Sequence, residues 1–167
     1  FGYTDYFRLL QQASGNDANF EGTINAQDDN GKTPLHIGIE CQRFPIVELI
    51  VQLCPQYDLV DVQENNILHY AASTNKEIIS VVCSWIQNQN QVQENCNEQT
   101  SLHRERLDKL INARNSRNFS PLYIACENDK PDCVKELLQN GADVNGASIG
   151  NDNHPRKDDS FDRNTNN

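Results

Sequence analysis

A short segment that combines a turn, a helix cap and a proline recurs in this chain and constrains its fold more than any other feature. Its first copy runs from Asp28 to Ile39 and reads DDNGKTPLHIGI. Gly31 supplies the positive φ that an Asp-Asn-Gly turn requires. Thr33 can cap the first amides of a helix, and Pro34 suits the first helical position because its missing N–H is not needed there. The segment therefore predicts a tight turn followed at once by a short helix.

The segment recurs twice further along the chain, which makes the pattern specific. His69 follows His36 by 33 residues, and Tyr123 follows His69 by 54, so the second interval contains 21 extra residues. In the third copy Ser120 and Pro121 restore the cap and the proline. Three copies at this spacing indicate stacked supersecondary units. We expect helix pairs near residues 34–53, 67–86 and 121–140.

Thr-Pro-Leu-His at residues 33–36 resembles the signature of the ankyrin repeat. The resemblance implies an all-α ankyrin-repeat solenoid of about three repeats within residues 23–145. We expect residues 1–22 to be the end of a partial upstream repeat and a loop. Residues 87–110 fall outside the repeat frame and predict an inserted loop and helix. Residues 146–167 are polar and predict a disordered tail.

Composition argues against several classes of function. The net charge is −10, which disfavours nucleic acid as a partner. Six cysteines occur without a Cys-x-x-Cys pair, so we expect no zinc or other metal, no cofactor, and reduced thiols in a cytoplasmic protein. Cys126 and Cys133 fall at apolar positions of the repeat and are expected in the core. Methionine is absent, so we expect this chain to be a piece of a longer protein.

One string suggests catalysis, but its context does not support it. Residues 146–150 read GASIG and fit the Gly-x-Ser-x-Gly elbow of serine hydrolases. That elbow needs a strand before the serine and a helix after it, and neither is predicted here. No catalytic residue is therefore assigned. His36 and His69 are interpreted as structural groups that bond the neighbouring turn and tie adjacent repeats, with Tyr123 in that place in the third copy.

The function that remains is the presentation of a surface to a protein partner. Ankyrin repeats bind through their turn tips and the concave face of their inner helices, and self-association through the repeats is the alternative. Simple solvent exposure is the competing explanation for any single tip residue. The candidate binding residues at the tips are Asp29, Asn30, Lys32, Gln63, Asn65 and Arg117.

A second resemblance is narrower. The runs at residues 46–54 (IVELIVQLC), 57–61 (YDLVD) and 69–71 (HYA) resemble the ankyrin region of the calcium-independent phospholipases A2, of group VI in the patatin-like lipase family. So does PLYIAC at 121–126, with Asn112 ahead of it. The resemblance implies a parent enzyme that hydrolyses the sn-2 ester of membrane phospholipids through a separate lipase domain. This chain would then be its regulatory segment, associated with membranes through the parent. The alternative is a non-catalytic ankyrin adaptor or scaffold.

Overall fold

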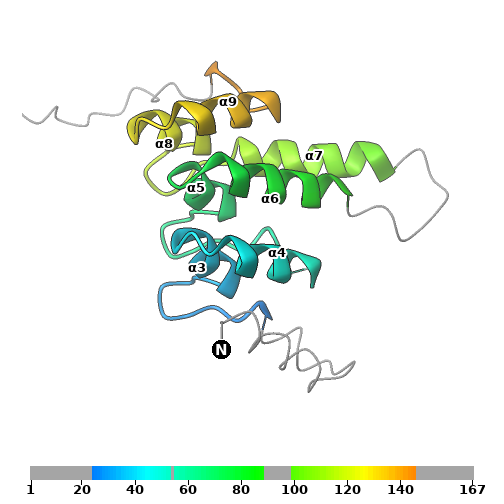
Figure 1. Ribbon diagram of the computed structural model, residues 1–167. Coiled ribbons are helices and arrows are strands. Elements are labelled where there is room, and N and C mark those ends of the chain that lie inside the picture. Colours follow the sequence, from blue (N-terminus) through cyan, green and yellow to red (C-terminus); the bar gives the residue numbers. More distant parts are fainter. Residues whose placement is uncertain (1–23, 54, 89–98, 146–167) are drawn as a thin grey trace, which may run out of the picture.

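The chain folds into pairs of helices, and each pair stacks on the one before it. The computed structural model describes residues 24–53, 55–88 and 99–145, and within these ranges it contains helices and no strand. The helix pairs lie one above another (Figure 1). This arrangement confirms the all-α repeat solenoid expected from the sequence. Residues 1–22 and 146–167, where a partial repeat and a disordered tail are expected, lie outside the described residues.

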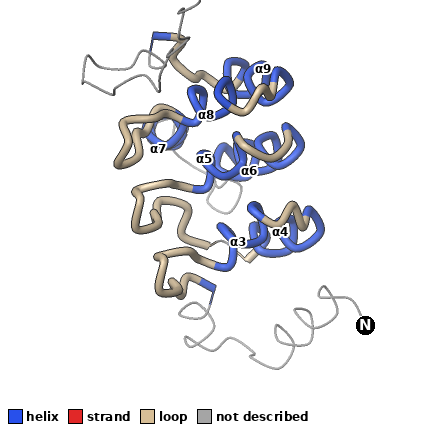
Figure 2. The backbone as a smooth tube through the Cα atoms, turned by 90° about the vertical axis from the view of Figure 1, so that its left-hand side faces the viewer, coloured by secondary structure: helices blue, strands red, loops and turns tan. Residues whose placement is uncertain are grey.

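Each repeat supplies a short inner helix and an outer helix. Figure 2 shows the outer helices on one side, the inner helices in the middle and the connecting loops on the opposite side, where α7 is seen end-on. Both inner and outer helices contact their counterparts in the next repeat. In chain order the helices are α3 (Pro34–Glu40) with α4 (Phe44–Gln52), α5 (Ile67–Ala72) with α6 (Lys76–Asn88), α7 (Gln99–Ile111), and α8 (Pro121–Glu127) with α9 (Pro131–Gln139).

The inner helices begin where the sequence predicts, because their caps are local. Thr33, Asn66 and Ser120 stand at the N-caps of α3, α5 and α8 in extended conformation. Each side-chain oxygen accepts a hydrogen bond from a first-turn amide, at 3.4, 3.1 and 3.2 Å. These bonds satisfy donors that would otherwise lack partners. In chain order the amides belong to His36, His69 and Tyr123.

The apolar residues of both helix layers form one continuous core. Such burial stabilises a domain at roughly 25 cal/mol per Å² of apolar surface removed from water. Cys133 is buried as expected, but the same expectation for Cys126 is wrong, because its side chain is exposed. The equivalent Ala72 is covered by the third repeat, whereas no described helix lies beyond α8 and α9. The largest fully buried apolar side chains are Leu35, Ile39, Ile50, Ile67, Leu68, Ile78, Ile79, Ile86, Ile111 and Leu137.

The turn tips share one construction. In each, the side-chain Oδ1 of Asp28, Asp61 or Asn115 accepts two backbone N–H groups, at distances between 2.7 and 3.0 Å. Neighbouring tips are then joined by single backbone hydrogen bonds of 2.9 Å each. The tips therefore form a continuous rigid edge. The joining bonds run from the Val62 N–H to the Asn30 carbonyl and from the Ser116 N–H to the Gln63 carbonyl.

The insertion adds a helix beside the stack. α7 packs against α6, with Leu107, Leu110 and Ile111 buried. The two helices run side by side and extend past the end of α9 (Figure 1). Residues 87 and 88, expected in the inserted loop, belong instead to α6, which continues to Asn88. Residues 89–98 lie outside the described part of the chain.

Gly31 is the position where the fold most clearly requires glycine. Its φ is +76°, and an added Cβ would lie 3.0 Å from both the Cα of Asp61 and the amide nitrogen of Val62. We expect Gly31→Ala to lower the free energy of unfolding by about 2 kcal/mol, because left-handed backbone strain adds to a clash between tips. Urea denaturation followed by far-UV circular dichroism measures this effect.

Gly38→Ala is the matched control for that substitution. Gly38 lies inside α3, and an added Cβ would meet Val47 Cγ2 at an ordinary 3.5 Å. Alanine should therefore be neutral there, or stabilise the protein by up to about 1 kcal/mol, since it forms helices better than glycine. Equal losses in the two variants would contradict the role assigned to the tip contact.

Candidate functional site

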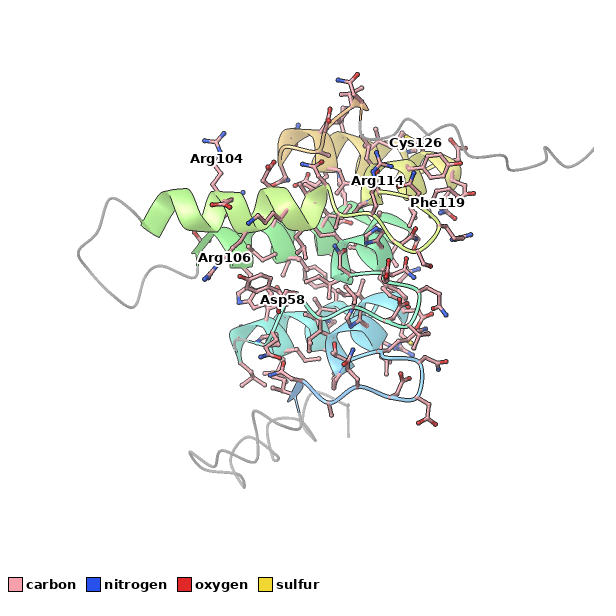
Figure 3. All side chains as sticks on the ribbon, turned by 180° about the vertical axis from the view of Figure 1, so that it is seen from behind. Asp58, Arg104, Arg106, Arg114, Phe119 and Cys126 are labelled. Atoms are coloured by element: carbon pink, nitrogen blue, oxygen red, sulfur yellow. The ribbon has the colours of Figure 1, made fainter. Side chains whose placement is uncertain are left out.

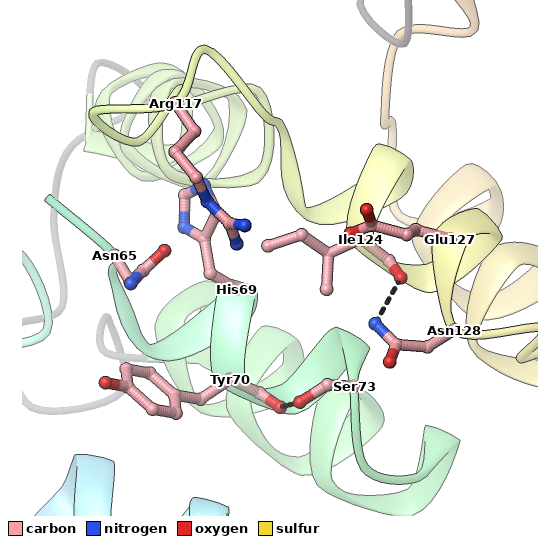
Figure 4. Close-up of a pocket in the computed structure, with 8 residues that line it drawn as sticks. All are labelled: Asn65, His69, Tyr70, Ser73, Arg117, Ile124, Glu127 and Asn128. Carbon is pink, nitrogen blue, oxygen red and sulfur yellow. Dashed lines mark hydrogen bonds between the residues drawn. The ribbon is translucent and has the colours of Figure 1, made fainter. Parts of the chain in front are cut away.

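A cavity of about 280 Å³ lies between the second and third repeats, where α5 faces α8 (Figure 4). It combines residues of two tips with residues of two inner helices, so it exists only because the repeats stack. Its mouth is open to solvent, and most of the residues that line it are polar, although polar and apolar atoms share its surface about equally. The residues that line it are Asn65, His69, Tyr70, Ser73, Arg117, Ile124, Glu127 and Asn128.

One wall of the cavity is fixed by a chain of side-chain hydrogen bonds. The amide Nδ2 of Asn65 donates to Asp61 Oδ2 at 3.0 Å, and its Oδ1 accepts from Asn115 Nδ2 at 2.7 Å. The hydroxyl of Tyr70 donates to the same Asp61 oxygen at 2.6 Å. Burial opposes ionisation of Asp61, but these hydrogen bonds hold its pKa below the ordinary value. A buried carboxylate therefore joins the second tip to its inner helix.

His69 also lines the cavity, and it connects the second repeat to the third. Its Nε2 lies 3.0 Å from the carbonyl oxygen of Phe119 in the next repeat, and its Nδ1 lies 3.1 Å from the Asn66 amide. We assign the proton to Nε2, which donates to that carbonyl and leaves Nδ1 to accept. Burial lowers the pKa of His69 to about 4, so the ring is neutral near pH 7. The structural interpretation of this histidine is confirmed.

His36 is bonded differently although it occupies the equivalent position. Its Nδ1 contacts the Thr33 hydroxyl at 2.8 Å, while its buried Nε2 has no hydrogen-bond partner among the described residues. The ring meets Tyr70 edge to face, with 5.4 Å between centroids. Burial lowers the pKa of His36, and the Asp61 carboxylate and the backbone of Asn65 in the next repeat oppose that shift. His36 therefore ties the repeats by ring packing and by its approach to the Asn65 backbone, although its Nε2 does not reach full hydrogen-bond geometry.

The third tip carries a stack of one cation and two aromatic rings. The guanidinium carbon of Arg117 lies 4.8 Å from the centroid of the Phe119 ring. Phe119 stacks on Tyr123, with centroids 4.3 Å apart and planes inclined by 25°. Tyr123 stands at the histidine position of the third copy, where it supports the ring beneath Arg117. A cation held over an aromatic face gains about 0.5–1 kcal/mol at an exposed site.

The six residues selected from the tips lie at three places. Asn65 and Arg117 come together at the cavity. Gln63 lies on the second tip outside the cavity lining, and the other three lie on the first tip. There Lys32 is already paired, because its Nζ lies 2.8 Å from a Glu40 oxygen and 5.2 Å from the centroid of the Tyr70 ring. Asn30 and Gln63 contact the next tip through their backbone carbonyls. Asp29, Asn30 and Gln63 are exposed.

The tip pattern did not identify the cavity residues that come from the inner helices. Tyr70 and Ser73 project from the end of α5, and Glu127 and Asn128 from the end of α8. The sequence does contain a pattern that would identify them. The residue that follows the fourth position of the Thr-Pro-Leu-His signature, and the residues three and four positions after it, lie on the same face of the inner helix. Applying that spacing in each repeat would have identified these four residues.

Two other kinds of feature, a metal site and a membrane-spanning helix, are absent from the part of the chain that the structure describes. Within residues 24–53, 55–88 and 99–145, no three His, Cys, Asp or Glu side chains are grouped so that they could hold a metal ion. In the same ranges, no helix is long and apolar enough to cross a membrane. Ser148, the serine of the GASIG string, lies outside them. Figure 3 shows Arg104 and Arg106 on α7, seen from behind the stack, and both residues are exposed.

Comparison with known proteins gives partial matches to longer chains. The nuclear factor NF-kappa-B p105 subunit of Gallus gallus is 24% identical over 130 residues, which cover 77% of this chain and 11% of that protein. The p105 subunit of Rattus norvegicus is 26% identical over 137 residues, covering 82% and 12%. The human ankyrin repeat and SOCS box protein 9 is 65% identical over 26 residues, covering 16% and 9%. The matched region thus spans about a tenth of each relative.

The family match is broader than these pairwise matches. The family model described as "Ankyrin repeats (3 copies)" matches residues 51–147, more than half of the chain. The match begins at the end of α4 and covers the second and third repeats together with α7. The repeat before it has the same cap, tip and helix pair. The chain therefore belongs to the ankyrin-repeat family, and its repeats imply a role in binding other proteins.

Proposed function

We propose that this chain is a protein-interaction module that binds an extended segment of its partner along the inner helices and the tips. The observation that carries the proposal is the cavity between α5 and α8, which is open, polar and built from two repeats. Stacked repeats create extended concave surfaces of this kind. The cavity would be the central contact, and the tips on either side would extend it.

The rigidity of the surface supports binding without large rearrangement. The tips are joined to each other by backbone hydrogen bonds, and Asp61, Asn65 and Asn115 connect them through side chains. A preformed surface loses less conformational freedom on binding than a mobile one. The partner then bears most of the ordering cost, as is usual for an extended peptide segment.

Peptide selection with one blocked variant tests this function. We expect the chain to enrich binders from a library of random peptides displayed on phage, and Ser73→Arg to lose them because the new side chain fills the cavity. Ser84→Arg is the matched control, since Ser84 is exposed on the outer helix α6. The same peptides retained by both variants, or no enrichment at all, would contradict binding at the inner face. Binding of a second copy of the chain would instead favour self-association.

The second candidate is that the module regulates a calcium-independent phospholipase A2 located in the cytoplasm and associated with membranes through its lipase domain. Its support is the resemblance of residues 46–54, 57–61 and 69–71 to the ankyrin region of those enzymes. The longer protein that carries this chain should then release fatty acid from phospholipid vesicles in the presence of a calcium chelator, and the isolated chain should not. A longer protein without that activity would favour the adaptor or scaffold.

A further inference from the structure

Arg117 is a cation held over an aromatic ring, without a carboxylate partner among the described residues. Asn115 Oδ1 accepts hydrogen bonds from the backbone N–H groups of Arg117 and Phe119, at 3.0 Å each, which fixes the tip beneath the side chain. The Phe119 ring then holds the guanidinium. In the described part of the chain, no carboxylate lies within ion-pair distance of Arg117. Because the guanidinium is already oriented, a ligand would gain a bidentate contact at low entropic cost.

This arrangement is peculiar to the third repeat. The positions equivalent to Arg117 hold Gln63 in the second repeat and Asn30 in the first, and both are uncharged. The other cation that faces an aromatic ring, Lys32, is neutralised by Glu40 at 2.8 Å. The repeat frame requires no particular residue at this tip position, so it does not explain why an arginine lies over a phenylalanine beside the contact between α5 and α8.

Glu127 supplies the opposite charge to the same cavity. Figure 4 shows Arg117 reaching in from the tip while Ile124 and Glu127 come from α8 on the other side. No ion pair joins Arg117 to Glu127, and Glu127 has no cationic partner within the described ranges. The part of the cavity beside Arg117 therefore favours a negatively charged group, and the part beside Glu127 favours a positively charged one. A lone carboxylate bound at Arg117 would also meet the repulsion of Glu127, and a lone cation at Glu127 would meet that of Arg117.

We propose that the cavity recognises a pair of oppositely charged side chains on one extended partner segment, which deepens the proposed function and rests on it. An aspartate or glutamate of the partner contacts the Arg117 guanidinium, and a nearby lysine or arginine contacts the Glu127 carboxylate. Apolar atoms of the two side chains cover Ile124. The chain's net charge of −10 disfavours a purely acidic segment at long range, so the basic member of the pair also assists encounter.

Two charge reversals test the pair, with the phage-displayed random peptides as the probe. We expect the unmodified chain to enrich peptides that contain an acidic and a basic residue close together. The Arg117→Glu variant should bind those peptides roughly tenfold or more weakly than the unmodified chain. It should instead enrich peptides in which a basic residue replaces the acidic one. The Glu127→Lys variant should weaken binding of the original peptides similarly and enrich peptides in which an acidic residue replaces the basic one. Both effects should decrease at high salt, because exposed ion pairs are screened.

Matched reversals elsewhere control for the change in net charge. Arg104→Glu on α7 and Glu48→Lys on α4 alter exposed residues away from the cavity and should leave the selected peptides unchanged. If the enriched peptides lack the charge pair but fail to bind the Ser73→Arg variant, this inference is overturned and the proposed function stands. The same peptides selected by Arg117→Glu as by the unmodified chain would also overturn it. If no peptide is enriched by any form, both proposals fail.

Discussion

Asp61→Ala is expected to lower the free energy of unfolding by about 3 kcal/mol, because one buried carboxylate organises the second tip. Its two oxygens accept from the backbone amides of Gln63 and Asn65, from the Asn65 side chain and from the Tyr70 hydroxyl, at 2.6–3.0 Å. Hydrogen bonds to a charged group contribute roughly 1.5–3 kcal/mol, and removing the acceptor leaves several donors unsatisfied at once. Urea denaturation of the variant measures the loss.

The first tip provides the matched control. Asp28 makes the same turn, and Asp28 Oδ1 accepts from Asn30 and Lys32, but the residue is exposed and water can replace the carboxylate. Asp28→Ala should therefore cost clearly less than Asp61→Ala. Comparable losses would show that the local turn, rather than the link from Asp61 to Tyr70, carries the stability.

Acid is expected to weaken the contact between the second and third repeats. The folded state lowers the pKa of His69 from 6.5 to about 4 by burial, so the unfolded chain binds a proton more readily than the folded one. Stability is therefore complete above the unfolded pKa and falls as pH decreases from about 6.5 toward about 4. Between pH 7 and about pH 4.5 the free energy of unfolding should fall by roughly 2–3 kcal/mol. His36 contributes in the same direction, because burial lowers its pKa too.

His69→Gln separates the proton effect from the packing effect. A glutamine amide can still donate toward the Phe119 carbonyl but cannot titrate. The variant should be less stable at pH 7 and should lose less stability on acidification than the unmodified chain. An unchanged pH dependence would assign the acid sensitivity to other groups. Urea midpoints measured at several pH values above the titration of the carboxylates make the comparison.

The elements that depend on local chemistry could be predicted from the sequence. Thr33, Asn66 and Ser120 cap their helices as expected, because a cap needs only a side-chain oxygen and a helix start. Recurrence then fixed the outer helix α6, whose β-branched residues alone fit helix or strand. Ile24 and Ile111 occupy equivalent positions of the first and third repeats, and both are buried. Repetition thus supplied information that one copy lacks.

The remaining features depend on what each repeat meets in space. Cys126 occupies a core position of the frame but is exposed, because burial there requires a repeat stacked on top. His36 and His69 have the same sequence context, yet of the two only the Nε2 of His69 makes a well-formed hydrogen bond to a carbonyl of the next repeat. Arg117 was predicted as a tip residue from the sequence, but its position in the same cavity as Glu127 depends on how α5 and α8 pack. Such contacts between repeats are not encoded by spacing along one of them.

The helix inserted before the third repeat leaves the geometry of the array unchanged. The tips of the second and third repeats are joined at 2.9 Å, as are those of the first and second, although 21 more residues separate the later pair in sequence. Asn112, immediately after α7, bonds the Asp143 amide at 2.8 Å, as Asn25 bonds that of Gln56. A change in the length of the connection between α6 and the third tip should therefore leave the contacts between the tips in place.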